Sequence, residues 1–130
     1  GGEGSGGVTV PQVHLTHDSA AAVGLILEGL ARSGEPVSEI VGQLPILFML
    51  KHNIAVEPNH LYSVLQDFRL AIEGEQLSYD LTDGIKVDLP EGWVHVRASN
   101  TESMIRVIVE AENESNARGL LDWARDRLKR

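Results

Sequence analysis

The chain has 130 residues, 42% of them apolar, which suits one domain with a real hydrophobic core. Its 19 acidic residues outnumber its 11 basic ones, and the net charge of −8 argues against a nucleic acid or an anionic membrane surface as partner. Cysteine is absent, which excludes disulfides and thiol chemistry and is compatible with a reducing cytoplasm.

The chain shows no targeting or membrane segment. No apolar run approaches the roughly 20 residues that a membrane-spanning helix needs, and no basic leader precedes an apolar core. The sequence starts without methionine, inside a glycine-rich run. We therefore expect a cytoplasmic location, no contact with a membrane, and a chain that is part of something longer.

Residues 1–7 form the glycine-rich run, and the β-branched residues 8–10 after it favour a short strand. Glycine and serine tracts are typical of flexible linkers, including those added in cloning. Glu3 is unusual in such a linker. The run is thus either a linker or a loop that carries function.

Two helical patterns follow the glycine-rich run. The first covers residues 18–33, with Asp18 as N-cap and Gly34 as a C-terminal stop. Its apolar residues cover more than one face, so we expect the helix to need partners on two sides. The second is a short helical turn over residues 36–44, with Ser38 as its cap and a proline as its end.

The remaining residues alternate between strand and helix patterns. In chain order we expect a strand at 46–56, a helix from Pro58 to Gly74, strands at 77–81, 85–89, 93–97 and 105–111, and a final helix from about residue 113. Asp83-Gly84 is a strong hairpin signal. This order predicts an α+β fold, a two-layer sandwich in which an antiparallel sheet of four to five strands packs one face against two helices.

Each of these two helices carries one apolar stripe at helical spacing. We expect the stripes to be buried against the sheet. Their members are Leu61, Val64, Leu65, Phe68 and Ile72 in the first helix, and Ala117, Leu120, Leu121, Ala124 and Leu128 in the second.

The loop between the last two strands is the most informative part of the sequence. Arg97 and Arg106 flank it, and Ser99, Asn100 and Thr101 lie within it. Guanidinium groups form paired, charge-assisted hydrogen bonds with phosphate oxygens, and hydroxyl and turn N–H groups supply further donors. A strand–loop–strand segment of this composition suits one small phosphate dianion.

The same residues are compatible with two other interpretations. The loop can be an ordinary hairpin whose arginines pair with Glu102 and Glu110 on the surface. It can also belong to a free-standing α+β module that binds a phosphorylated or acidic partner through Arg97 and Arg106. Composition and spacing alone leave the three interpretations open.

Residues 97–106 resemble the phosphate-binding signature of the α-D-phosphohexomutases, which reads Arg-x-Ser-(Gly or Asn)-Thr-Glu-Pro with a second arginine a few residues on. Here Asn100 takes the variable place, and Ser103 stands where proline is usual. The glycine-rich run is similar to the Gly-Glu-x-Ser-Gly loop of that family's third domain. The resemblance implies that residues 1–35 are the end of the third domain and that residues 36–130 are the fourth.

By the same resemblance, the phosphate of a hexose phosphate would be bound by Arg97, Ser99, Asn100, Thr101 and Arg106. Glu3 and Ser5 would contact hydroxyls of the sugar ring. These positions do not distinguish glucose, mannose and glucosamine phosphates.

The resemblance also implies an isomerase of carbohydrate metabolism. The family transfers a phosphoryl group between the 1- and 6-positions of a hexose phosphate through a phosphoserine and a hexose bisphosphate, assisted by Mg²⁺. The phosphoserine loop and the aspartate-rich metal loop belong to the first two domains. We therefore expect no catalytic residue and no metal site in this chain, no activity from it alone, and the remaining domains of the same protein as its partners.

Other chemistry is less well supported by the sequence. His14 and His17 lie close together but have too few further ligands nearby for a zinc site. His95 alternates with valines, so its side chain should point away from the core. Trp93 and Trp123 are expected to pack in the core or between helix and sheet.

Overall fold

The computed structural model describes residues 1–2 and 6–128, and the chain divides into two compact units, Gly1–Pro45 and Ile46–Arg130. The division follows the short helix α2 (Val37–Gly42), whereas the sequence analysis placed the boundary before it, between residues 35 and 36. The side chain of Gln43, just after α2, donates to the Glu35 carboxylate at 3.0 Å, which ties this helix to the residues before it.

The first unit is built on helix α1 (Ser19–Ser33), whose predicted ends are confirmed. The Asp18 side chain accepts a hydrogen bond from the Ala21 N–H at 2.9 Å, and Gly34, at φ 70°, closes the last turn onto Leu30 O at 3.0 Å. No residue of α1 is buried within this unit. Apolar residues on several sides of the helix are exposed. The described residues therefore do not supply the partners that the apolar pattern of the helix predicts.

Two local predictions for the first unit were wrong. Residues 8–10 form no strand, and only an isolated bridge joins Gly2 to Val8. Helix α2 is preceded by Pro36 and not by Ser38 as its N-cap residue, and no side chain caps it. The fixed φ of proline suits the start of a helix, so the turn forms without a hydroxyl cap.

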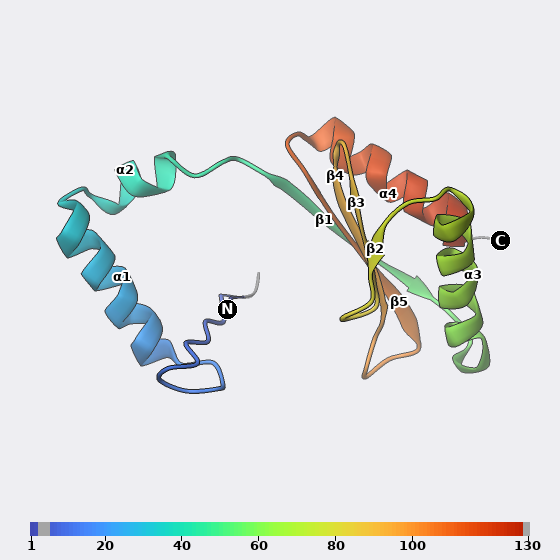
Figure 1. Cartoon of the computed structure of the whole chain (residues 1–130), viewed down its shortest axis with the longest axis horizontal. Helices are drawn as coiled ribbons and strands as arrows, with labels where there is room; N and C mark the ends of the chain where they lie inside the picture. The colour runs from blue at the N-terminus through green and yellow to red at the C-terminus, as the bar shows by residue number, and fades with distance from the viewer. Residues whose placement is uncertain (3–5, 129–130) are drawn as a thin grey trace. The chain divides into compact units, whose positions relative to one another are not determined.

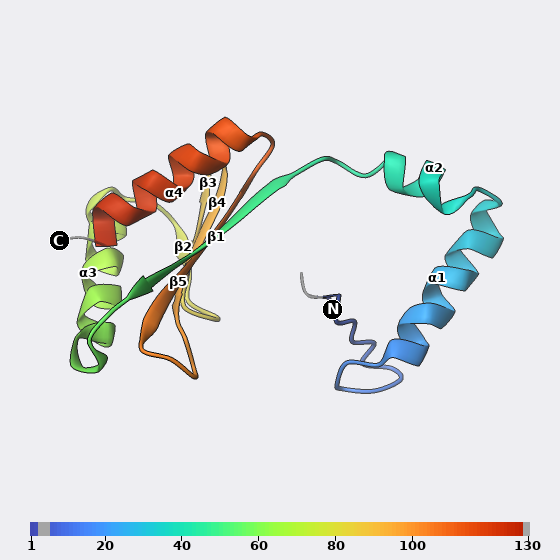
Figure 2. The same ribbon diagram turned by 180° about the vertical axis from the view of Figure 1, so that it is seen from behind.

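The second unit contains a five-stranded antiparallel sheet with helices α3 and α4 on one face, which confirms the predicted α+β sandwich (Figures 1 and 2). The strand order is β1-β5-β4-β3-β2. The elements are β1 (Phe48–Ala55), the 3₁₀ turn η1 (Pro58–His60), α3 (Leu61–Gly74), β2 (Tyr79–Asp80), β3 (Ile85–Leu89), β4 (Gly92–Ala98), β5 (Met104–Ala111) and α4 (Glu114–Leu128).

The core lies between the sheet and the two helices. Alternate residues of β3, β4 and β5 point into it, and the predicted stripes of α3 and α4 meet them. Val64, Leu65 and Leu121 are partly buried, and the other stripe members are buried. Trp123 of α4 packs edge-on against Phe68 of α3, with ring centroids 6.1 Å apart, so its ring is partly buried between the two helices, against the core.

The first strand of the predicted hairpin is shorter than expected. Only Tyr79–Asp80 pairs with β3, whereas residues 77–81 were predicted. The Asp80 carboxylate accepts from the Thr82 N–H at 2.7 Å and from its hydroxyl at 2.6 Å, so the side chain begins the turn early. These bonds also hold the pKa of Asp80 below its ordinary value of 3.8.

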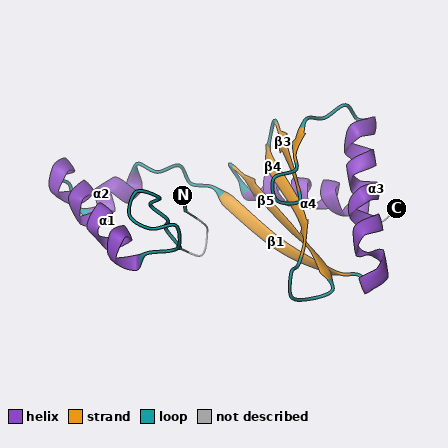
Figure 3. Cartoon of the chain, turned by 60° about the horizontal axis from the view of Figure 1, so that its bottom comes forward, coloured by secondary structure: helices purple, strands orange, loops and turns teal. Residues whose placement is uncertain are grey.

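The second face of the sheet is not covered by α3 or α4 (Figure 3), and we call it the open face. In β4 it presents Trp93, His95 and Arg97, which alternate with the buried Val94 and Val96. The expected outward orientation of His95 is confirmed. The prediction for Trp93 was wrong, because this residue lies on the open face and its indole N–H finds a carboxylate there.

A candidate phosphate-binding site at the β4–β5 loop

Strand pairing places the two predicted arginines directly opposite each other. Arg97 of β4 is the register partner of Arg106 of β5, and both belong to the open face. Opposite residues of antiparallel strands have side chains that begin about 4.5–5.5 Å apart, and like charges in such a pair repel. The pair therefore concentrates positive charge in an otherwise acidic protein.

The Arg106 side chain has no acceptor for its Nε. This atom is buried and lacks a hydrogen-bond partner, and no ion pair involves Arg106 among the described residues. A buried polar group without a partner is costly, more so when it carries charge. Arg106 is thus a cation whose own domain does not neutralise it.

Arg97 is only partly neutralised. Its side chain is 27% exposed, and its Nη1 lies 3.8 Å from an Asp83 carboxylate oxygen, at the long limit of an ion pair. The alternative pairing with Glu102 or Glu110 is not formed in the described residues. Glu110 instead accepts from Trp93 Nε1 at 3.0 Å. The interpretation as an ordinary hairpin with paired arginines therefore does not match the contacts.

The loop at residues 99–103 is fixed at its base and exposed at its tip. The Ser99 N–H donates to Met104 O at 2.9 Å, and the Met104 N–H donates to Glu102 O at 2.9 Å. Ser99 is half-buried, whereas Asn100 and Thr101 are exposed. The hydroxyl and amide groups of the predicted cradle are thereby accessible next to the strand ends that carry the arginines.

Ser103, which stands at the usual proline position, anchors the loop to the neighbouring strand. Its hydroxyl donates to Val56 O at 2.6 Å, and the Val56 N–H donates to Ser103 O at 3.2 Å. Proline has no side-chain donor for the first of these bonds. The serine therefore holds the loop by hydrogen bonds where proline would restrict it by its ring.

The loop also borders a hollow on the side of the sheet that carries the helices. The hollow has a volume of about 450 Å³ and lies between residues 98–103 and the start of α3, where Pro58, Leu61 and Tyr62 line it. Tyr62 is 81% exposed. The structure thus brings all five predicted phosphate-binding residues to one end of the sheet, with the arginines on the open face and the loop between that face and the hollow.

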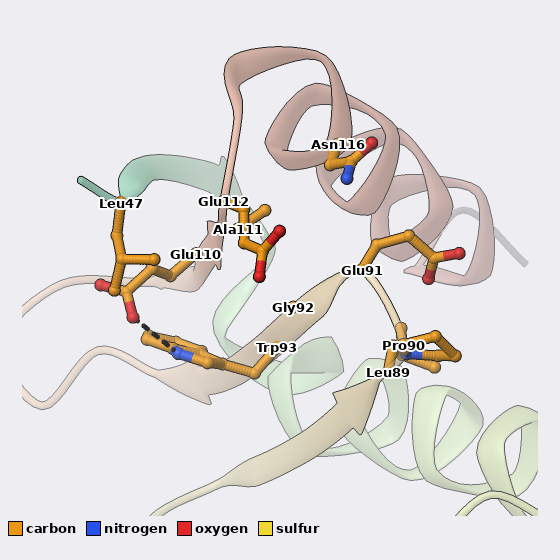
Figure 4. Close-up of a pocket in the computed structure, with 10 residues that line it drawn as sticks. All are labelled: Leu47, Leu89, Pro90, Glu91, Gly92, Trp93, Glu110, Ala111, Glu112 and Asn116. Carbon is orange, nitrogen blue, oxygen red and sulfur yellow. Dashed lines mark hydrogen bonds between the residues drawn. The ribbon is translucent and has the colours of Figure 1, made fainter. Parts of the chain in front are cut away.

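A second hollow, of about 390 Å³, lies at the opposite end of the sheet (Figure 4). Glu91, Glu110 and Glu112 line it, together with Trp93 and Asn116. Three carboxylates repel a phosphate, so this hollow does not suit the expected ligand. The charge distribution therefore favours the loop end of the sheet.

The turn between β2 and β3 is the part of the site that the sequence analysis missed. His95 Nε2 contacts the Asp83 carbonyl oxygen, and the Asp83 carboxylate lies beside Arg97. From the sequence, Asp83 is expected only to form the turn. The register of β3 against β4 is the signal that brings this turn next to Arg97.

The remaining predictions concern the sugar contacts, a metal site and a membrane-spanning segment. Glu3 and Ser5, the predicted sugar contacts, are outside the described residues. Within residues 1–2 and 6–128, no three histidine or carboxylate side chains are grouped in a way that would hold a metal ion. In the same residues, no helix has the length and apolarity to cross a membrane.

Comparison with known proteins identifies the family. Residues 54–126 match the family model for the phosphoglucomutase/phosphomannomutase C-terminal domain. Residues 1–48 match the model for the alpha/beta/alpha domain III of the same proteins. The chain belongs to the phosphoglucomutase/phosphomannomutase family. The resemblance seen in the loop residues is thus confirmed over almost the whole chain.

Individual relatives agree with this assignment. A phosphoglucomutase/phosphomannomutase from Thermococcus kodakarensis is 39% identical over 122 residues, which cover 94% of this chain and 26% of that protein. A probable phosphoglucosamine mutase from Methanopyrus kandleri is 32% identical over 130 residues, covering 100% of this chain and 29% of that protein. The chain therefore spans little more than a quarter of the length of these relatives.

A solved structure shares the fold. The crystal structure of a phosphoglucomutase/phosphomannomutase family protein from Burkholderia thailandensis superposes with a TM-score of 0.74 at 25% sequence identity. The match covers 98% of this chain and 27% of that one. The family match and this likeness together support the fold of each unit.

Proposed function

We propose that the complete protein is a phosphohexomutase, and that this chain supplies the site that binds the phosphate group of a hexose phosphate. The complete protein would interconvert hexose 1-phosphate and hexose 6-phosphate through a hexose bisphosphate. Arg97 and Arg106 would neutralise the phosphate group that is not being transferred, and Ser99, Asn100 and Thr101 would donate hydrogen bonds to it.

The observation that carries the proposal is the Arg97–Arg106 pair. The two arginine side chains start from opposite positions on adjacent strands, and the Nε of Arg106 is buried without an acceptor. A phosphate dianion placed between them would relieve their repulsion and supply the missing acceptor. An uncharged ligand could supply an acceptor but would not relieve the repulsion between the two cations.

The chemistry of transfer is proposed to lie outside this chain. Mg²⁺ binds oxygen ligands, and no three histidine or carboxylate side chains of the described residues are grouped so as to hold a metal ion. We therefore assign no step through the metal to these residues. The remaining domains would supply the phosphoserine and the metal site, and this chain would position the substrate. We place the complete protein in the cytoplasm.

The contacts to the sugar are proposed to be separate from the contacts to the phosphate. The loop contacts concern the phosphate, which glucose, mannose and glucosamine phosphates have in common. Glu3 and Ser5 are the proposed contacts to the sugar hydroxyls. Because one site must hold the substrate in both of its orientations, we expect the phosphate contacts to dominate binding and the sugar contacts to be permissive.

The proposal is tested by replacing Arg97 with alanine in the complete protein. The loss of one charge-assisted interaction should weaken binding of glucose 1-phosphate by about 1.5–3 kcal/mol, roughly 10- to 150-fold. Arg118, an exposed arginine of α4 that pairs with Glu114, provides the matched control. Unchanged KM and kcat in Arg97→Ala, or an equal loss in Arg118→Ala, would contradict the assignment.

A further inference from the structure

The turn at residues 81–84 is packed directly against the strand that carries Arg97. A Cβ added to Gly84 would lie 2.6 Å from Arg97 Cβ and 2.5 Å from Val96 O, which leaves no room for a side chain. The φ of Gly84, 77°, also favours glycine. His95 Nε2 meets the Asp83 carbonyl oxygen from the same strand. The turn therefore has a defined position beside the candidate site.

This position places one carboxylate next to the phosphate-binding arginine. Asp83 Oδ2 lies 3.8 Å from Arg97 Nη1, and the Asp83 side chain is 69% exposed. No hydrogen bond joins the two side chains in the described part of the chain. The carboxylate thus contributes negative charge near Arg97, but the N–H donors of the guanidinium group stay available for another acceptor.

We propose that Asp83 is an intramolecular counter-ion of Arg97 that competes with the incoming phosphate. This inference rests on the proposed function. In the empty site the carboxylate partly neutralises the arginine pair. When phosphate binds, both anions face one cation, and their mutual repulsion weakens binding. Asp83 thereby lowers the phosphate affinity of the loop and favours release, which suits a site that must let its ligand go and take it again in the other orientation.

The effect should be small because the pair is exposed and screened. Exposed ion pairs are worth about 0.2–1 kcal/mol, which corresponds to about a 1.5- to 5-fold change in affinity. Removing the charge of Asp83 should therefore tighten phosphate binding by that factor. A purely structural role for the turn would leave the affinity unchanged or reduce it.

The test is a titration of the 130-residue chain with inorganic phosphate at low ionic strength, followed by amide NMR shifts of residues 97–106. Asp83→Asn keeps the size of the side chain and removes its charge. Asp88→Asn is the matched control, because Asp88 is an exposed carboxylate on β3 that pairs with Lys86 and lies opposite Trp93, four residues along β4 from Arg97. Both variants change the net charge equally.

We expect Asp83→Asn to bind phosphate about 1.5- to 5-fold more tightly than Asp88→Asn. In an Arg97→Ala background the difference should vanish. Equal affinities of the two variants, with phosphate still bound at the loop, would overturn the counter-ion role alone. Absence of phosphate-dependent shifts at residues 97–106 in the unaltered chain would overturn both the proposed function and this inference.

Discussion

Arg106 is the residue whose replacement tests the electrostatics of the site most sharply. In phosphate-free buffer it presents a buried Nε without a partner and a like charge opposite Arg97. Methionine has a similar volume but carries neither a charge nor a side-chain N–H donor. We therefore expect Arg106→Met to stabilise the empty chain while it destroys phosphate binding.

The size of the effect follows from the group that is removed. A buried donor without an acceptor costs about 1–3 kcal/mol, and replacing buried charge by apolar volume is often neutral or stabilising. Since Arg106 is only half-buried as a whole, we expect the free energy of unfolding to rise by about 1–2 kcal/mol. For a unit of this size that corresponds to a rise in Tm of roughly 4–16 °C.

Urea unfolding followed by tryptophan fluorescence measures this change in the second unit selectively. Both tryptophans of the chain, Trp93 and Trp123, belong to that unit. Arg118→Met is the control, because Arg118 is exposed and its loss should change the stability by less than about 0.5 kcal/mol. Adding phosphate at about ten times its Kd should stabilise the unaltered chain by about 1.4 kcal/mol and leave Arg106→Met unchanged.

Two results would refute this reasoning. If Arg106→Met unfolds more easily than the unaltered chain without phosphate, Arg106 contributes to the fold and its charge is not a cost. If phosphate stabilises Arg106→Met as much as the unaltered chain, the anion does not bind at this arginine.

Three further substitutions have defined outcomes. Arg127→Lys should lower the free energy of unfolding by about 1 kcal/mol in urea titrations, because lysine cannot replace the two bonds of 2.8 and 2.9 Å to Glu75. The Tyr79 hydroxyl, with Arg69, lowers the pKa of Glu73 from its ordinary 4.5, so this stabilisation is present above pH 4.5 and lost as the pH falls through the folded-state value. Tyr79→Phe should therefore lose less stability on acidification, seen as urea midpoints that vary less below about pH 5. Ser103→Ala should speed amide hydrogen exchange in the loop, because the hydrogen bond of the Ser103 hydroxyl to Val56 O, just after β1, is lost.

The sequence was sufficient for the elements of the second unit because their patterns agree with their surroundings. Residues 85–89 alternate cleanly, and the structure has a strand at those residues. The apolar stripe of α4 faces the core where the sequence placed it, with Leu121 only partly buried. The exceptions have local causes. The Asp80 side chain hydrogen-bonds to Thr82 and ends β2 early, and in the first unit α2 begins after Pro36 without the predicted serine cap.

The candidate site was predicted in its residue types but not in its pairing. Arg97 lies opposite Arg106 because of the register between β4 and β5. A loop of a different conformation would shift this register. The approach of Asp83 depends on how a neighbouring hairpin packs against β4, which no short motif encodes. The position of Trp93 on the open face likewise depends on which side of the sheet the helices cover.

The most direct test of the phosphate site is an amide NMR titration of the chain with glucose 1-phosphate, with uncharged glucose as the control ligand. We predict shifts concentrated at residues 97–106 with glucose 1-phosphate, no shifts there with glucose, and loss of the response in Arg97→Ala. Equal shifts with both ligands, or a response that survives in Arg97→Ala, would contradict a phosphate site on this loop.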